Sequence, residues 1–418
     1  CMASFLKVVY PRFEVIVVDD GSKDRTGEIA DKYAALRPDI FKVIHQPNMG
    51  LSAARNVGLY AAAGEITAYT DSDCYVDPDW LTFMAWAFTD PRFAAVGGPN
   101  LPPPEDNRIA ACVAVSPGAP THVLLSDDVA EHIPGCNMAF RTEVLKSVGG
   151  FDVTYRAAGD DVDACWRLMD QGHLIGFDAG MFVWHHRRNT IKAYLKQQNG
   201  YGRAEALLAP KHHERFNALG NSRWAGRIYG DISGHTLTVR PIIYHGVFGN
   251  GLFQTLYEPR ASLFSHLPLS FEWIMAAAVL VALGPAMPWL AAAGLLMLAA
   301  TLVWSVNRAA FAKLPPAYDD WESRAIIAFL TMSQPVLRGW TRYWTLLTLA
   351  KAFARVTRDA QTTPAPKPPA PVQEIQPHAS LLHKLGELAT LLVHSFSFHR
   401  FFWNHQGVER EALLQMLM

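Results

Sequence analysis

A stretch of about 35 residues between Glu272 and Arg308 contains no Asp, Glu, Lys or Arg, and it constrains the fold more than any other feature. One membrane-spanning helix needs only about 20 apolar residues. Residues 284–288 (GPAMP) interrupt the stretch with two prolines and a glycine, which break helices. We therefore expect two apolar helices, near residues 271–283 and 289–306, joined by this turn.

The tryptophans near the ends of this stretch, Trp273, Trp289 and Trp304, favour a membrane hairpin, because indole rings prefer the membrane interface. Arginine and lysine on both flanks place both flanks in the cytoplasm. The alternative is a hairpin buried in a protein core. Residues 324–353 mix apolar and basic side chains, and we expect a surface-lying amphipathic helix there, broken at Pro335.

Composition excludes several classes of protein. The net charge is -1, which argues against nucleic-acid binding. Half of the residues are hydrophobic, which excludes global disorder. The five cysteines include no CxxC pair, which argues against a disulfide scaffold and a structural zinc site.

Strand-like apolar runs alternate with helical patterns in the first 230 residues. We expect strands at 13–18, 42–44 and 65–70 and helices at 26–36 and 56–63. This alternation predicts an α/β domain with a mostly parallel sheet.

Acidic side chains follow two of these strands. Asp19 and Asp20 come after the first, and Asp71 and Asp73 after the third. Ligands of open α/β sheets bind beyond the carboxyl ends of the strands, so both clusters should face one crevice. Carboxylates suit Mg²⁺ or Mn²⁺, although such a pair is more often a solvated turn.

A third acidic cluster opens a helical pattern at residues 160–163 (DDVD). The helix dipole favours acids in the first turn, so capping alone is one interpretation. Beside a metal–phosphate site, one of these carboxylates becomes a candidate general base.

Four motifs then appear in order: VVDDGSKDRT, NMGLSAARNVGLYAAAGEITAYTDSD, GCNMAFRTEVLKSVGGFD and GDDVDACWRL. Over about residues 8–230 the chain resembles glycosyltransferase family 2. The resemblance implies a GT-A fold, which is Rossmann-like with a mostly parallel sheet, over residues 1–230. We expect a connector to follow at 231–268, the transmembrane hairpin at 269–307, interfacial helices at 308–361, a Pro-rich linker at 362–378 and a helical segment at 379–418.

The resemblance implies a nucleoside-diphosphate sugar as donor, with a UDP-sugar preferred. Asp20, with Asp19 beside it, matches the aspartate that contacts the base or ribose, and Gly21 would allow the tight turn. Arg55 would face the diphosphate, or else form an ion pair on a helix surface.

The resemblance also implies a divalent cation, Mg²⁺ or Mn²⁺. Asp73 would bind the metal, and Asp71 would bind the ribose or the metal. His185 or His186 would complete the metal shell, and a basic loop is the alternative for this pair.

The general base would be Asp161, beside Asp160, which stands where the family usually has Glu. Repulsion between the two acids could raise one pKa, which would suit a base. The segment Gly135, Cys136 and Asn137 matches the loop that lines the acceptor and donor-sugar side.

These features together predict a metal-dependent inverting glycosyltransferase with its catalytic domain on the cytoplasmic side of the plasma or inner membrane. The acceptor would be a cell-surface polysaccharide, a lipid-linked glycan or a related molecule. The alternatives are a processive polysaccharide synthase, to whose QxxRW motif residues 197–203 are only loosely similar, and a non-catalytic scaffold. We also expect truncation at both ends, with the first strand missing and the 418-residue chain inactive as it stands.

Overall fold

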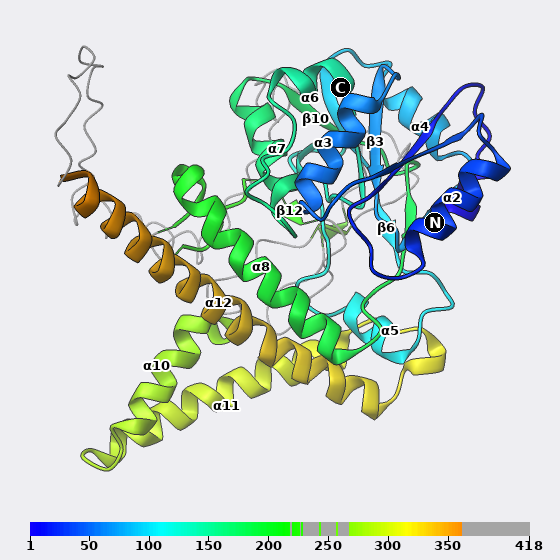
Figure 1. The fold of residues 1–418 in the computed structure, drawn as a ribbon. Coiled ribbons are helices and arrows are strands. Elements are labelled where there is room, and N and C mark those ends of the chain that lie inside the picture. Colours follow the sequence, from blue (N-terminus) through cyan, green and yellow to red (C-terminus); the bar gives the residue numbers. More distant parts are fainter. Residues whose placement is uncertain (218–219, 226, 229–241, 244–255, 258–266, 362–418) are drawn as a thin grey trace, which may run out of the picture.

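The computed structural model describes residues 1–217, 220–225, 227–228, 242–243, 256–257 and 267–361 (Figure 1). Most of the expected connector 231–268 lies outside the described residues, as do the expected linker 362–378 and the C-terminal segment 379–418. The expectations for those segments stay predictions.

The chain begins with a short helix and a parallel pair of strands. After α1 (Met2–Phe5), β1 (Val15–Asp19) pairs in parallel with β2 (Phe41–His45), and α2 (Thr26–Leu36) connects the two strands. The bounds of α2 are those expected from its periodicity. The next helix, α3 (Leu51–Ala61), begins at Leu51 rather than at residue 56.

A seven-stranded sheet forms the centre of the domain, in the order β12–β7–β8–β10–β5–β9–β3. Only β10 and β5 pair in parallel, and the other neighbours are antiparallel. The expectation of a mostly parallel sheet is therefore wrong: the fold is α/β with a mixed sheet. The strands are β3 (Ile66–Thr70), β5 (Phe93–Gly97), β7 (Val123–Leu124), β8 (Val129–His132), β9 (Asn137–Arg141), β10 (Leu174–Phe177) and β12 (Arg227–Ile228).

The hydrophobic pattern of a strand does not show whether it runs parallel or antiparallel to its neighbours. β9 inserts between β3 and β5 and runs antiparallel to both. Its residues 137–140 are buried, as in the parallel strands of an α/β fold. An apolar run of this kind predicts burial but leaves the neighbour and the direction open.

Smaller elements complete the domain. A three-stranded sheet joins β4 (Cys74–Val76), β11 (Val183–His185) and β6 (Asn100–Leu101). The remaining short elements are α4 (Trp80–Ala87), α5 (Arg108–Ala114), α6 (Thr142–Ser147), β13 (Ile242–Ile243) and β14 (Leu256–Tyr257).

The helix α7 (Asp160–Asp170) is fixed by the main core. Leu168 packs with Phe140 of β9, Leu145 of α6 and Phe151, and none of these four side chains is more than 1% exposed. Large side chains packed in this way hold a helix in a single position. The first turn of α7, with its three carboxylates, is therefore held rigidly at the edge of the sheet.

Two long helices run side by side beneath the α/β domain (Figure 1). They are α8 (Ile191–Lys211) and α12 (Trp321–Gln361). Contrary to expectation, α12 continues through Pro335. A proline removes one backbone hydrogen bond, but α12 packs along α8, where the backbone carbonyl of Arg338 leaves no room for a side chain at Gly202.

The apolar stretch forms the two expected helices, α10 (Phe271–Ala282) and α11 (Pro288–Phe311). They pack closely, since a Cβ at Gly294 would lie 2.6 Å from the carbonyl oxygen of Ala277. Among the described residues, α11 alone is long and apolar enough to cross a membrane, and only 17% of its apolar window is buried. At 1.5 Å per residue, α10 is about 18 Å long against a hydrocarbon core of about 30 Å, so a hairpin of two full spans is not confirmed.

Candidate active site

The loop after β1 is held by its own carboxylates. Asp20 accepts hydrogen bonds from the side-chain amide of Gln46 (2.6 Å) and from the backbone N–H groups of Met49 and Gly50 (both 2.8 Å). Burial opposes ionisation of Asp20, yet these donors hold its pKa below the usual value. The oxygens of Asp20 thus position the loop, and the expected contact with a nucleotide stays a prediction.

Asp19 and Gly21 have similar structural roles. Asp19 accepts from the backbone N–H of Ser22 (3.0 Å) and lies 3.0 Å from Nδ1 of His45. Gly21 has φ of 72°, and a Cβ there would lie 2.9 Å from the backbone nitrogen of Asn48. A tight turn with no room for a side chain requires glycine at this position.

Arg55 lies at the centre of the site. Its side chain is 8% exposed, so it is buried rather than on the surface of α3. Nη1 donates to Asp160, and Nη2 donates to Asp71 (3.3 Å) and to the carbonyl oxygen of Gly135 (3.1 Å). Burial would lower the pKa of Arg55, but the surrounding carboxylates raise it, and the guanidinium is always charged.

The two acids at the start of α7 have different environments. The side chain of Asp160 is 2% exposed and paired with Arg55, whereas that of Asp161 is 21% exposed and lines a cavity. Burial, together with the neighbouring Asp161, raises the pKa of Asp160. The acid with the raised pKa is therefore Asp160, not the expected base Asp161.

Asp161 is surrounded by donors. Its Oδ2 accepts from the backbone N–H of Gly135 (2.9 Å), and its Oδ1 accepts from the N–H of Val162 (2.9 Å). Nε2 of His132 lies 3.5 Å from Oδ2. Sequence reasoning did not single out His132, because no spacing to the acidic motifs marks this residue.

The expected acceptor-side loop divides into two parts. Gly135 and Cys136 line the cavity. Asn137 is buried away from it, accepts from the indole N–H of Trp80 and donates to two backbone carbonyls. Asn137 is therefore a structural residue.

Two of the expected metal ligands, Asp73 and His185, lie where β4 and β11 pair. Cys74 and His185 are opposite each other in this antiparallel pair. Ligand atoms of Asp73, Cys74 and His185 all lie within 4.8 Å of one another, and Oδ1 of Asp73 is 3.4 Å from Nε2 of His185. His186 points elsewhere, with Nδ1 2.7 Å from Asp106, so the structure separates two histidines that the sequence left equivalent.

Two arginines donate hydrogen bonds to this group of possible metal ligands. Arg188 donates to Oδ2 of Asp73 (3.0 Å), and Arg187 donates to Nδ1 of His185 (2.7 Å). Because arginine can only donate, the neutral ring of His185 carries its proton on Nε2, toward Asp73. Metal binding at that nitrogen would require the proton to leave. Asp71 stands apart from this group, beside Arg55.

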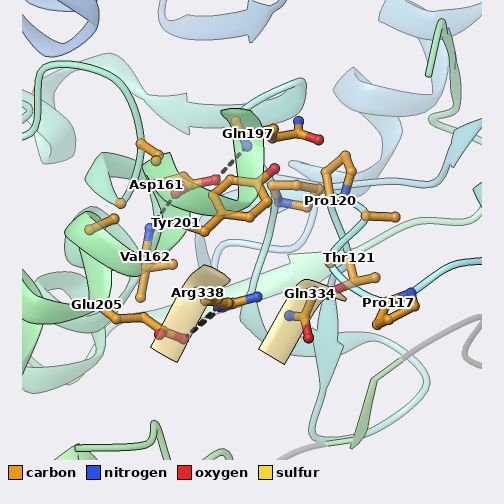
Figure 2. A pocket seen from close by; sticks show the side chains of 18 of the residues that line it. Pro117, Pro120, Thr121, Asp161, Val162, Gln197, Tyr201, Glu205, Gln334 and Arg338 are labelled. Atoms are coloured by element: carbon orange, nitrogen blue, oxygen red, sulfur yellow. Dashed lines mark hydrogen bonds and ion pairs between the residues drawn. The ribbon is translucent and has the colours of Figure 1, made fainter. Parts of the chain in front are cut away.

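A cavity of about 1170 Å³ extends from these residues to a helical layer formed by α8, α11 and α12. Arg55, Asp71 and Asp161 line it together with residues of α8, the end of α11 and α12. Figure 2 shows Asp161 and Val162 with Tyr201 and Gln197 of α8, and Gln334 and Arg338 of α12. Arg338 is held by Glu205, whose Oε1 accepts from Nη2 at 2.7 Å.

The comparisons identify the class of protein. Residues 1–149 match the family model for glycosyl transferase family 2. A pre-mycofactocin glycosyltransferase of Mycobacterium tuberculosis is 31% identical over 211 residues, which are 49% of this chain and 44% of the relative. Glycosyltransferase AglE of Haloferax volcanii is 27% identical over 209 residues, covering 49% of this chain and 67% of the relative.

The first part of this chain, residues 1–149, is therefore similar to glycosyltransferase family 2. The chain spans about half the length of the first of these relatives. Among solved structures, a mannosyltransferase of Pyrobaculum calidifontis in complex with GDP-Man and Mn²⁺ is 19% identical, with a TM-score of 0.44, and 82% of each chain is covered.

Proposed function

We propose that this protein is a metal-dependent, inverting glycosyltransferase that moves a sugar from a nucleoside-diphosphate donor to a glycan, lipid-linked or related acceptor. The observation that carries the proposal is that Asp71, Arg55 and Asp161 line the same large cavity. These residues come from two of the four motifs, and their side chains differ in charge and exposure as a donor site and a base would require.

The donor end offers the groups that a nucleoside diphosphate needs. Arg55 supplies a rigid, charged fork, which suits binding of a diphosphate. Asp73 and His185 have the donor atoms for a divalent cation, and nothing in the set distinguishes Mg²⁺ from Mn²⁺. When bound, the cation would neutralise charge on the departing diphosphate.

Asp161 is the proposed base. It faces the cavity, while Asp160 is already committed to Arg55. The acceptor hydroxyl would lose its proton to Asp161 as its oxygen attacks the anomeric carbon, and a single displacement would invert the configuration.

The helical layer supports a location at the cytoplasmic face of the plasma or inner membrane. α11 has the length and composition of one span, and α12 exposes Trp340 and Trp344, whose rings stack at 6.2 Å. Tryptophans of this kind favour the membrane interface. The cavity reaches this layer, which suits an acceptor held at a membrane.

The relative in Mycobacterium tuberculosis suggests a second acceptor class, because its name is pre-mycofactocin glycosyltransferase. An acceptor of that kind is the alternative to a polysaccharide. A processive synthase and a non-catalytic scaffold stay open as further alternatives, and the retained acidic residues count against the scaffold.

The deciding experiment is a donor panel with the full-length protein. UDP- and GDP-sugars are incubated with and without EDTA, and the released nucleoside diphosphate is measured. We expect release from one donor class and its loss in EDTA. No release from any sugar nucleotide, with metal present and acceptor supplied from membrane extract, would overturn the proposal.

A further inference from the structure

A buried histidine faces the carboxylate that we assign as the base. His132 is the last residue of β8, and its side chain is 9% exposed. Its Nε2 lies 3.5 Å from Oδ2 of Asp161, the oxygen that also accepts from the N–H of Gly135. The other face of the imidazole lies against Trp224, with ring centroids 5.5 Å apart.

The opposite nitrogen settles which atoms carry protons. Nδ1 of His132 lies 3.0 Å from the carbonyl oxygen of Thr121. A carbonyl oxygen can only accept, so Nδ1 carries a proton. In a neutral ring, Nε2 would then present a lone pair to the carboxylate of Asp161, and the two acceptors would repel each other.

A second proton on the His132 ring, on Nε2, removes the repulsion between Nε2 and the Asp161 carboxylate. The contact then becomes a charge-assisted hydrogen bond, which is stronger than one between neutral groups. Nε2 is shielded from solvent and has no other hydrogen-bond partner among the residues that the structure describes. The geometry therefore favours an imidazolium facing a carboxylate.

Other charged and titratable groups face this pair from every side. Around Asp161 they are Arg55 from α3, Asp160 and Cys165 from α7 and Tyr201 from α8, and His122 lies near His132. Burial would raise the pKa of Asp161, but His132, Arg55 and the N–H of Gly135 hold it well below its usual range.

We propose that His132 is the positioning residue of the base: its imidazolium keeps the Asp161 carboxylate ionised and turned toward the cavity. The inference rests on the proposed function, because it assumes that Asp161 receives the proton of the acceptor hydroxyl. In that step the acceptor oxygen bonds to the anomeric carbon, and its proton moves to Asp161. The bond from that carbon to the diphosphate breaks, and its electron pair leaves on the diphosphate. His132 keeps its own proton throughout.

The test is the pH profile of sugar transfer, measured as kcat/KM for the acceptor with the full-length protein. The wild-type profile should fall only at low pH, where Asp161 takes up a proton. In His132→Phe this acid limb should move upward by roughly 1 to 3 pH units, since a nearby opposite charge shifts a carboxyl pKa by about that amount.

His132→Gln separates the charge from the packing. Its amide can donate a hydrogen bond to Asp161 but carries no charge, so the acid limb should move upward by less than in His132→Phe, while transfer near neutral pH is largely kept. His213→Gln is the control, because the side chain of His213 is 86% exposed and distant from the pair in the sequence. Its profile should equal that of the wild type.

The outcomes distinguish the two proposals. If the wild type transfers no sugar, the proposed function fails first. If the wild type transfers sugar and the acid limb stays in place in both His132→Phe and His132→Gln, the role of His132 is wrong and the transferase function stands. Should His132→Phe not fold, the acid limb of His132→Gln decides.

Discussion

Arg55 and Asp160 form a buried ion pair that joins α3 to α7, with side chains 8% and 2% exposed. The same guanidinium donates to Asp71 and to the carbonyl oxygen of Gly135. One side chain therefore sets the relative positions of three motifs that lie far apart in the sequence.

Arg55→Ala should destabilise the protein strongly. Removing one partner leaves Asp160 buried without a counter-charge, which costs about 3–5 kcal/mol of unfolding free energy. Denaturant titration measures this. The control is Arg92→Ala, because Arg92 is 50% exposed in its pair with Asp90 and should change stability by at most about 1 kcal/mol. Equal effects of the two variants would contradict a central role for Arg55.

Asp161→Asn should abolish sugar transfer but leave donor binding unchanged. An amide cannot take the acceptor proton, so kcat should fall by roughly 10²–10⁴-fold. Donor affinity, measured by calorimetry, should stay near the wild-type value. Asp170→Asn lies at the other end of α7, is 48% exposed and should leave kcat unchanged. Normal transfer by Asp161→Asn would mean that another group is the base.

Asp73→Ala should weaken donor binding only when metal is present. In EDTA the variant and the wild type should bind the donor alike, because the loss acts through the cation. His185→Ala should raise the metal concentration needed for half-maximal binding by roughly 10-fold. His186→Ala is the matched control, since His186 pairs with Asp106 instead. A larger effect of His186→Ala than of His185→Ala would reverse the assignment.

Gly135→Ala should displace Arg55. A Cβ at this position would lie 2.5 Å from Nη2 of Arg55, so the guanidinium must move away from its partners. Overpacking of this kind costs about 1–3 kcal/mol, and misplacement of the site should lower kcat by roughly 100-fold. Gly200→Ala has no atom within 4 Å of its Cβ in α8 and should stabilise the helix by up to about 1 kcal/mol. Unchanged activity in Gly135→Ala would show that Arg55 tolerates a new position.

Local patterns predicted the elements well. The 3.6-residue periodicity gave the bounds of α2, and the charge-free stretch gave α10 and α11 on either side of the proline-containing turn. The predicted break at Pro335 was wrong. Proline breaks a helix because of its local backbone energy, but α12 is held along its length by packing against α8.

The candidate site was predictable in its residue types but not in its pairing. Acidic clusters are visible in a sequence, and Asp71 and Asp161 line one cavity. Asp19 and Asp20, which were expected to face the same crevice as Asp71, are not among the residues that line this cavity. The sequence does not show which face of each element turns inward. This orientation decides that Arg55 is buried among the acids, and that His185 rather than His186 lies beside Asp73.

The sequence by itself determined the resemblance to a family, several of the helices and the candidate residues for metal and proton binding, because periodicity and motif chemistry are local properties. The tertiary structure alone decided the mixed sheet, the difference between a fully buried Asp160 and a partly exposed Asp161, and the approach of His132 to the proposed base. These depend on contacts between residues far apart in the chain, and on the burial that such contacts create, which no local pattern encodes.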